Sequence, residues 1–178
     1  MMLGAISLSD LQYRPAEPED AGALANLRVL AMKDSLEALG RFDPVRARER
    51  FLLGFEPNCT QQIFQNAVLV GFWVLKPQEP VWLLDHLYVL PGHQGQGIGA
   101  QVLVCVFAQA DRAGKTLRLG ALKGSRSNDF YLRHGFVKVG EGEWDLYYER
   151  QAMSVDCSDR GFVPAAPVQV RGVGPADQ

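Results

Sequence analysis

One segment constrains the fold of this chain more than any other: residues 89–100, Val-Leu-Pro-Gly-His-Gln-Gly-Gln-Gly-Ile-Gly-Ala. An apolar run precedes it and a helical period follows it, so we expect a buried strand that passes directly into a helix through a glycine-rich turn. A helix N-terminus presents unpaired N–H groups and the positive end of the helix dipole, and glycines let a phosphate approach that backbone. Gly95, Gly97 and Gly99 stand at alternate positions, which is more glycine than a tight turn requires. The turn is therefore predicted to bind an anion, and a purely structural connection is the alternative.

Two nucleotide-binding motifs compete for these residues. The P-loop of NTPases is excluded because no Lys-Ser or Lys-Thr follows the last glycine. The dinucleotide fingerprint is closer, since Gly95-x-Gly97-x-x-Ala100 formally satisfies G-x-G-x-x-A. However, no acidic residue lies about 20 residues further on to hold a ribose; Arg118 and Lys123 occupy that region instead. The motif also sits mid-chain after predicted antiparallel strands, and we do not expect it to open a βαβ unit.

Hydrophobic periodicity and turn residues predict the remaining elements. Strands are expected at residues 11–14, 60–64, 67–75, 81–89, 116–121, 136–139 and 144–148. Helices are expected at 18–38, at 44–54 after an Asp43-Pro44 start signal, from Ile98 to a stop at Gly114, and at 128–134. Short links between the strands imply antiparallel neighbours, and the last two strands form a hairpin around residues 140–142. The predicted fold class is α/β (α+β): a mixed, mostly antiparallel sheet flanked by helices.

Length and composition suit one domain. Of the 178 residues, 47% are apolar, as in an ordinary globular protein. We expect a leader at 1–10, a domain at 11–150, and a tail at 151–178 in which proline and glycine interrupt any period.

Charge and cysteine content exclude several classes of function. The 18 Lys and Arg residues nearly balance the 20 Asp and Glu residues, which argues against nucleic acid or an anionic membrane as a partner. Cys59, Cys105 and Cys157 form no C-x-x-C pair, and no two histidines have metal-ligand spacing, so neither a disulfide framework nor a metal site is indicated. No signal peptide or apolar run of about 18 residues is present, so we expect a protein of the reducing cytoplasm.

The glycine-rich turn resembles the cofactor loop of the GNAT superfamily of N-acetyltransferases. The family pattern, Gln/Arg-x-x-Gly-x-Gly/Ala after a strand ending in Val-x-Pro, is filled by Gln94, Gly97 and Gly99 after Val89 and Pro91. A second motif agrees: residues 128–136, Asn-Asp-Phe-Tyr-Leu-Arg-His-Gly-Phe, are similar to the family's segment on a short helix after the fifth strand. The resemblance covers most of residues 11–149 and implies a GNAT-like fold.

The same resemblance implies acetyl-CoA as co-substrate and names the residues that hold it. Strand backbone would pair with the pantetheine arm, the turn would cradle the pyrophosphate, and an asparagine would contact the pantetheine. These residues are Leu87, Tyr88 and Val89 on the strand, Gln94, Gly95, Gln96, Gly97, Ile98 and Gly99 in the turn, and Asn128. Local charge supports a polyanion independently, because residues 112–138 hold seven Lys or Arg and one acid, Asp129. A solvated basic face is the commoner meaning of such a cluster.

Acyl transfer to an amine needs a neutral amine, a donor to the oxyanion and a proton for the departing thiolate. The resemblance implies a backbone N–H near Val89 for the oxyanion and Tyr131 as the acid; a buried aromatic is the alternative for Tyr131.

The general base is less defined. Where some family members carry a glutamate, this chain has Leu83 and Leu119. Asp85 shares a strand face with Leu83, while His86 faces the other way unless a bulge resets the register. Asp85 and His86 are therefore the candidate bases, directly or through water, with a structural histidine as the alternative for His86.

The acceptor is predicted to lie against the first two helices and the last strands. That region offers acids and aromatics that would suit a cationic amine, unless the acids merely solvate the surface: Asp34, Glu37, Asp43, Trp73, Trp144 and Asp145. The leading hypothesis is an acetyl-CoA-dependent N-acetyltransferase acting on a small-molecule amine or a protein amino group. A non-catalytic, coenzyme A-binding regulatory domain and a dinucleotide oxidoreductase are the alternatives, and a homodimer stays open.

Overall fold

A computed structural model describes residues 11–154 of the chain. The strands within these residues are β1 (Leu11–Pro15), β2 (Thr60–Gln65), β3 (Val68–Lys76), β4 (Trp82–Val89), β5 (Leu117–Leu122), β6 (Val137–Glu141) and β7 (Asp145–Arg150). The helices are α1 (Ala21–Ala38), α2 (Pro44–Leu53), α3 (Ile98–Ala113) and α4 (Ser127–Arg133), with short 3-10 turns η2 (Pro18–Asp20), η3 (Pro57–Cys59) and η4 (Pro91–His93). The predicted elements all exist, with ends displaced by a few residues at most.

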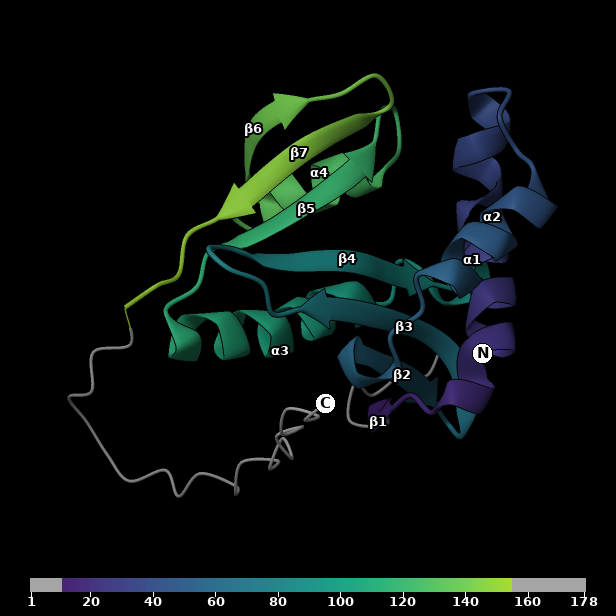
Figure 1. Cartoon of the computed structure of the whole chain (residues 1–178), viewed down its shortest axis with the longest axis horizontal. Coiled ribbons are helices and arrows are strands. Elements are labelled where there is room, and N and C mark those ends of the chain that lie inside the picture. The colour runs from purple at the N-terminus through teal and green to yellow at the C-terminus, as the bar shows by residue number, and fades with distance from the viewer. Residues whose placement is uncertain (1–10, 155–178) are drawn as a thin grey trace, which may run out of the picture.

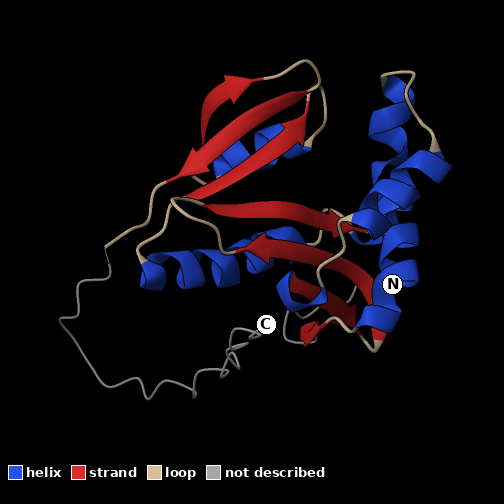
Figure 2. Cartoon of the chain, viewed as in Figure 1, coloured by secondary structure: helices blue, strands red, loops and turns tan. Residues whose placement is uncertain are grey.

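The seven strands form one sheet in the order β1-β2-β3-β4-β5-β7-β6. Every neighbouring pair is antiparallel except β4 and β5, which run parallel. The predicted mixed, mostly antiparallel sheet flanked by helices is confirmed (Figure 2).

Two apolar layers cover the two faces of the sheet. Alternate side chains of β3 serve different layers: Trp73 and Leu75 join the cluster built on α3 and α4, whereas Phe72 and Val74 join the cluster built on α1 and α2. A strand buried on both faces reads as a continuous apolar run, as β3 does. The sheet is therefore the middle layer, and both helix pairs are positioned against it (Figure 1).

Local sequence sets two of the helix ends that position the site. Asp43 caps α2, because its Oδ1 accepts the Arg46 backbone N–H at 3.0 Å, and Pro44 occupies the first helical position. Gly114 ends α3 in the left-handed region, at φ +64°. The start of α2 after Asp43 and the end of α3 at Gly114 are thus as the sequence predicted. None of the described helices is long and apolar enough to cross a membrane.

One sequence-based argument was wrong. We expected the glycine-rich turn not to open a βαβ unit, yet β4, α3 and β5 form one, since β4 and β5 are parallel and α3 connects them. The antiparallel strands earlier in the chain gave no sign of this change of direction. The remaining argument against a dinucleotide site is the absence of a ribose-binding acid.

The parallel pairing of β4 and β5 is very short. Only Trp82 with Leu117 and Leu83 with Arg118 are in register, after which the strands diverge (Figure 1). A bulge accompanies the divergence, because Leu75 pairs with Leu84 and Val74 pairs with His86, which leaves Asp85 without an opposite residue on β3.

The final hairpin turns later than predicted. β6 continues through Gly140 and Glu141, and the turn closes where the Gly142 N–H donates to the Asp145 carbonyl at 2.8 Å. A register shift between Lys138 and Gly140 absorbs the extra residue, which alternation alone could not reveal. The predicted leader and most of the predicted tail lie outside the described residues, so that division stays a prediction.

Candidate active site

The divergence of β4 and β5 creates an opening in the middle of the sheet. Beyond Leu83 on β4 and Arg118 on β5, no residues of the two strands are paired with each other. The other edge of β4 pairs with β3, and the other edge of β5 pairs with β7. The backbone groups that face one another across this interstrand opening are thus available to an extended ligand, in the manner of an added strand.

The glycine-rich turn lies directly beyond the end of β4. Gly97 is the N-cap of α3, and the first backbone bond of the helix runs from the Gln101 N–H to the Gly97 carbonyl at 3.1 Å. Within residues 11–154, the N–H groups of residues 95–100 donate to no backbone or side-chain acceptor. This donor set, together with the helix dipole, can bind a phosphate.

The three alternating glycines have structural explanations that the sequence did not show. Gly95 and Gly97 have φ of +74° and +81°, in the region that favours glycine. Gly99 is helical, but a Cβ there would lie 3.0 Å from the Phe130 ring of α4. The glycine count is therefore no excess over what the backbone and packing require. The unpaired N–H groups are the stronger evidence for an anion site.

Glutamine side chains hold the turn in place. The Gln94 amide donates to the Val89 carbonyl at 2.8 Å and so ties the turn to the end of β4. Gln65, buried at the end of β2, lies 3.4 Å from Gln96 and 2.9 Å from His93 Nδ1. Sequence reasoning missed Gln65, although a polar residue at a buried strand end is the kind of signal that marks such an anchor.

Asn128 makes internal hydrogen bonds at the start of α4. Its Nδ2 donates to the Leu122 and Ser125 carbonyls, both at 2.9 Å, and its Oδ1 accepts the buried Tyr148 hydroxyl at 2.9 Å. Both amide protons are used, so only the second lone pair of Oδ1 is left for a ligand. The side chain fixes α4 against the ends of β5 and β7, and in this way it positions Tyr131.

Tyr131 lies on α4 with its ring packed against Phe130 and Phe136. Only 7% of the residue is exposed. Burial raises the pKa of the phenol, and the nearby Tyr88 adds to this shift. The hydroxyl therefore keeps its proton at neutral pH. The ring also contributes to the main apolar cluster, so Tyr131 is a core aromatic as well as a candidate acid.

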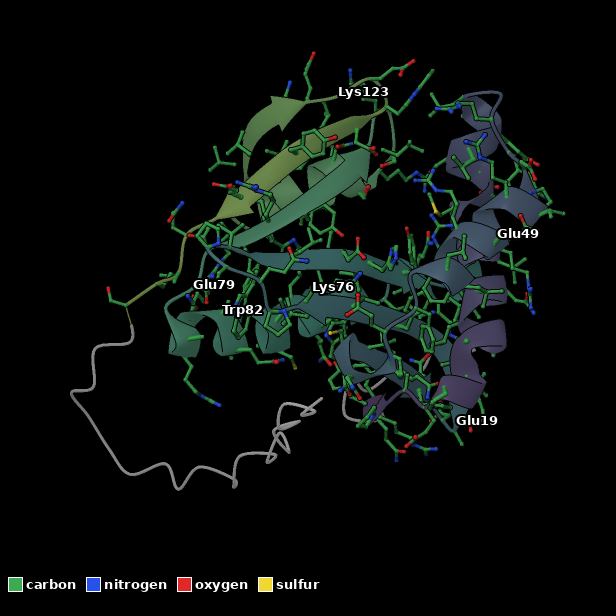
Figure 3. All side chains as sticks on the ribbon, in the orientation of Figure 1. Glu19, Glu49, Lys76, Glu79, Trp82 and Lys123 are labelled. Atoms are coloured by element: carbon green, nitrogen blue, oxygen red, sulfur yellow. The ribbon has the colours of Figure 1, made fainter. Side chains whose placement is uncertain are left out.

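Asp85, the unpaired residue of the bulge, is held in an ion-paired group. Lys76 of β3, labelled in Figure 3, lies 3.0 Å from Asp85 and 2.9 Å from Glu56. Burial alone would lower the pKa of Lys76, but its hydrogen bonds to Glu56 and Asp85 raise it overall. The Asp85 carboxylate is thus already engaged by a charged lysine that it shares with Glu56.

His86 is a partly buried imidazole. It packs against Phe51, Phe72 and Tyr88, its Nε2 lies 3.7 Å from the Asp85 carboxylate, and its Nδ1 is buried without a partner within the described residues. Burial is the main reason that its pKa falls to about 4; Asp85 opposes the shift, and Arg28 and Lys76 add to it. The ring is unprotonated at neutral pH but weakly basic.

A cleft of about 830 Å³ separates the first two helices from β4, β5 and β7. Its lining comes from α1 (Arg28, Met32, Leu36), the α1–α2 turn (Gly40, Arg41, Phe42, Asp43), α2 (Arg46, Ala47, Arg50), β4 (Leu83, Leu84, Asp85, His86, Tyr88), β5 (Arg118, Leu119, Gly120, Leu122) and the start of β7 (Trp144, Asp145, Tyr147). The two strands that border the interstrand opening, β4 and β5, form one wall of this cleft. The volume is that of a site for a small organic molecule.

The predicted acceptor residues divide between this cleft and other places. Asp43, Trp144 and Asp145 line the cleft. Trp73 is instead in the main core, and Asp34 and Glu37 are exposed and outside the lining. Sequence reasoning did not assign the arginines of the cleft, although Arg46, Arg48 and Arg50 stand at alternate positions in α2, because linear order does not show which of them face the cleft.

The basic stretch at 112–138 is weaker evidence for a polyanion than the sequence suggested. Four of its seven cations pair with glutamates outside the stretch: Lys115 with Glu79, Arg118 with Glu149, and Lys123 and Lys138 with Glu141. Glu141 follows Lys138 by three residues, whereas the pairing with Glu79 and Glu149 depends on the fold. No cluster of three or more metal-ligating side chains occurs between residues 11 and 154.

Comparison with known proteins supports the resemblance. Residues 61–138, which include the bulge, the glycine-rich turn and α4, match the acetyltransferase (GNAT) domain model. The match spans β2 to β6 and therefore both sides of the interstrand opening.

Solved GNAT-like structures share the fold at low sequence identity. The PaiA N-acetyltransferase of Thermoplasma acidophilum, in complex with coenzyme A, is 18% identical, with a TM-score of 0.67 over 79% of this chain and 98% of that one. An acetyltransferase of Thermus thermophilus is 23% identical, with a TM-score of 0.63 over 79% and 96%. The ribosomal-protein-alanine N-acetyltransferase of Escherichia coli is 16% identical, with a TM-score of 0.63 over 84% and 99%. The fold of residues 11–154 is thus that of complete GNAT domains.

The state of His86 can be measured directly. Its folded pKa, about 4, is below the ordinary value of 6.5, so the neutral form is favoured by folding. We predict that its NMR ring signals, assigned with His86→Gln, stay in the neutral position from pH 7.5 down to about pH 5. The contribution of neutral His86 to the free energy of unfolding is fully present above pH 6.5 and is lost as the pH falls toward 4. The parent should therefore lose more stability over this range than His86→Gln. A titration midpoint near pH 6.5 would contradict the desolvated environment of the His86 ring.

Proposed function

We propose that the chain is an acetyl-CoA-dependent N-acetyltransferase that transfers an acetyl group to a primary amine. The observation that carries the proposal is the continuity of three features: a turn of unpaired N–H groups, an opening between parallel strands, and a cleft at the far side of that opening. A long donor with a phosphate end and a thioester end needs such a path. The GNAT domain match, and neighbours named N-acetyltransferases, one of them holding coenzyme A, support it.

The residues fit the donor at two places. The free N–H groups of residues 95–100 would bind its pyrophosphate, and the open edge of β4 along residues 87–89, where the backbone groups of Leu87 and Val89 face away from β3 and Tyr88 lies between them, would pair with its amide-containing arm. When bound, acetyl-CoA supplies an activated acetyl thioester. Gln94 and Asn128, proposed as cofactor contacts, would act through the turn and α4 that they hold.

Tyr131 is proposed as the general acid. Burial raises the pKa of its phenol, so the hydroxyl carries a proton at neutral pH, although the same shift makes it a weaker acid toward a leaving thiolate. A backbone N–H of β4 near Val89 would stabilise the oxyanion, because it lies on the open edge of the strand.

The base is the weakest element of the chemistry. Leu83 and Leu119 line the cleft where some GNAT family members carry a glutamate, Asp85 is paired with Lys76, and His86 has a pKa of about 4. We propose that Asp85 and His86 accept the proton through water, from an amine that enters partly neutral. The same observations favour the second candidate function, a coenzyme A-binding domain without catalysis. We place either activity in the reducing cytoplasm, where Cys59 and Cys105 remain free thiols.

Donor binding is tested by thermal shift. We predict that acetyl-CoA raises the melting temperature and NAD does not, because the turn can hold a pyrophosphate but no acid is available for a ribose. Gly97→Val should abolish the shift, since a β-branched residue is strained at φ +81° and obstructs the anion. Gly92→Ala is the matched control, because a Cβ at Gly92 meets nothing within 4 Å. A shift with NAD alone would refute the donor assignment.

Catalysis is tested at Tyr131. With an acceptor found by a thiol-release screen, Tyr131→Phe should lower kcat by about 10²-fold while the dissociation constant for acetyl-CoA changes little, because only the proton is removed. Tyr13→Phe, on β1 against Trp73, controls for loss of a phenol elsewhere. Parent-like turnover would make Tyr131 a packing residue, and a parallel loss of affinity would make it a binding contact. Donor binding without turnover on any amine would instead favour the non-catalytic domain.

A further inference from the structure

The cleft that receives the acceptor is rich in arginine. Five arginines and three aspartates line it, although the chain as a whole carries a formal charge of −2. Two of these charges are matched locally, since Arg118 pairs with Glu149 and Asp85 pairs with Lys76. Within residues 11–154, no carboxylate lies within salt-bridge distance of the cleft's other arginines. The excess positive charge is therefore local to the α1–α2 wall.

Arg28 is the arginine of the α1–α2 wall that lies beside Tyr88 of β4. One of its terminal nitrogens donates to the Ala47 carbonyl at 2.7 Å, which fixes the guanidinium between α1 and α2. Its Nε is buried and has no partner in the described part of the chain. The guanidinium carbon lies 5.9 Å from the centre of the Tyr88 ring, and its charge helps to lower the pKa of His86. A half-buried cation without a counter-charge is costly, and a bound anion would remove that cost.

The other free arginines extend the same wall. Arg46 and Arg50 stand one helical turn apart on α2, so both reach the cleft from one face of the helix. Of the three aspartates that line the cleft, Asp43 caps a helix and Asp85 pairs with a lysine, which leaves Asp145 on the opposite wall. An acceptor that carries only positive charge would be repelled by the arginines of this wall.

The entrance favours a small acceptor. Arg41 of the α1–α2 turn stacks over the Trp144 ring at 3.8 Å, and Trp144 precedes β7. The contact joins the two walls of the cleft. Arginine stacked on tryptophan is a stabilising pair, so a bulky chain would have to break it to enter.

We propose that the acceptor is a small amine that carries its own anionic group, a carboxylate or a phosphate, which Arg28 binds with help from Arg46 and Arg50. Planar guanidinium groups bind carboxylate and phosphate oxygens in pairs, which gives orientation as well as affinity. The anion is held at the α1–α2 wall and the amine then points toward the interstrand opening. This inference rests on the proposed function and names the chemical class of its acceptor, which the sequence left open.

The test compares acceptors in matched pairs. With acetyl-CoA as donor, thiol release is measured for amino acids beside their carboxamides, for phosphoethanolamine beside ethanolamine, and for spermidine. The anionic member of a pair should be the better substrate, and the two pairs distinguish carboxylate from phosphate. Arg28→Gln should lower kcat/KM for the anionic acceptor by about 10- to 100-fold, chiefly through KM, and leave the amide almost unchanged. Arg50→Gln, exposed on α2, should act in the same direction if Arg28→Gln proves unstable.

The matched control is Arg48→Gln. Arg48 also joins α2 to α1, through a 3.1 Å bond from its Nε to Asn26, but it lies outside the cleft lining. A second readout needs no turnover: with coenzyme A saturating and ionic strength constant, acetate or inorganic phosphate should raise the melting temperature of the parent and of Arg48→Gln, but not of Arg28→Gln. Preference for amides or spermidine, or equal behaviour of the Arg28 and Arg48 variants in both readouts, would overturn the inference. Failure of acetyl-CoA to bind would instead refute the proposed function, and the anion titration, repeated without coenzyme A, would still decide this inference by its dependence on Arg28.

Discussion

The two-residue pairing between β4 and β5 is the constraint on which the rest of the site depends. Because the strands separate after Leu83 and Arg118, the sheet has an internal edge on each side of the opening. Unpaired backbone inside a protein is costly unless something pairs with it, and sheets normally avoid such edges. The bulge at Asp85 bends β4 at the same point. A gap of this kind is what a ligand with its own amide groups can fill.

The elements around the opening hold it in place. On one side, α3 begins at Gly97 and presents its free N–H groups beyond the end of β4, in a turn anchored by Gln65 and Gln94. On the other side, Asn128 and Tyr148 fix α4 against β5 and β7. The first two helices then close the far end, where the cleft collects unpaired arginines. Each part is positioned by a few polar side-chain contacts, which need specific partners and so favour one arrangement.

Sequence reasoning succeeded where the signals are local. The helix starts and stops, the short links and the apolar run of β3 predicted the elements and the mixed sheet. It failed where the decisive partner is distant in sequence. The β4–β5 crossover, the distant glutamates that pair with the basic stretch, the role of Gly99 against Phe130 and the arginine wall all depend on tertiary contacts. The bulge that places Asp85 and His86 side by side was left open by the sequence, since one extra residue in a strand has no periodic signature.

Hydrogen–deuterium exchange with and without acetyl-CoA tests the central claim most directly, because it reports the backbone groups themselves. We predict slower exchange on donor binding at residues 87–89 and 95–100, where amides line the open strand edge and the turn, and little change in β1 and β2. A second, smaller cavity lies near Tyr13, Trp73 and Trp82 and offers a contrasting location. Protection there, or binding of acetyl-CoA with unchanged exchange at 87–89 and 95–100, would contradict the assignment of the interstrand opening as the donor site.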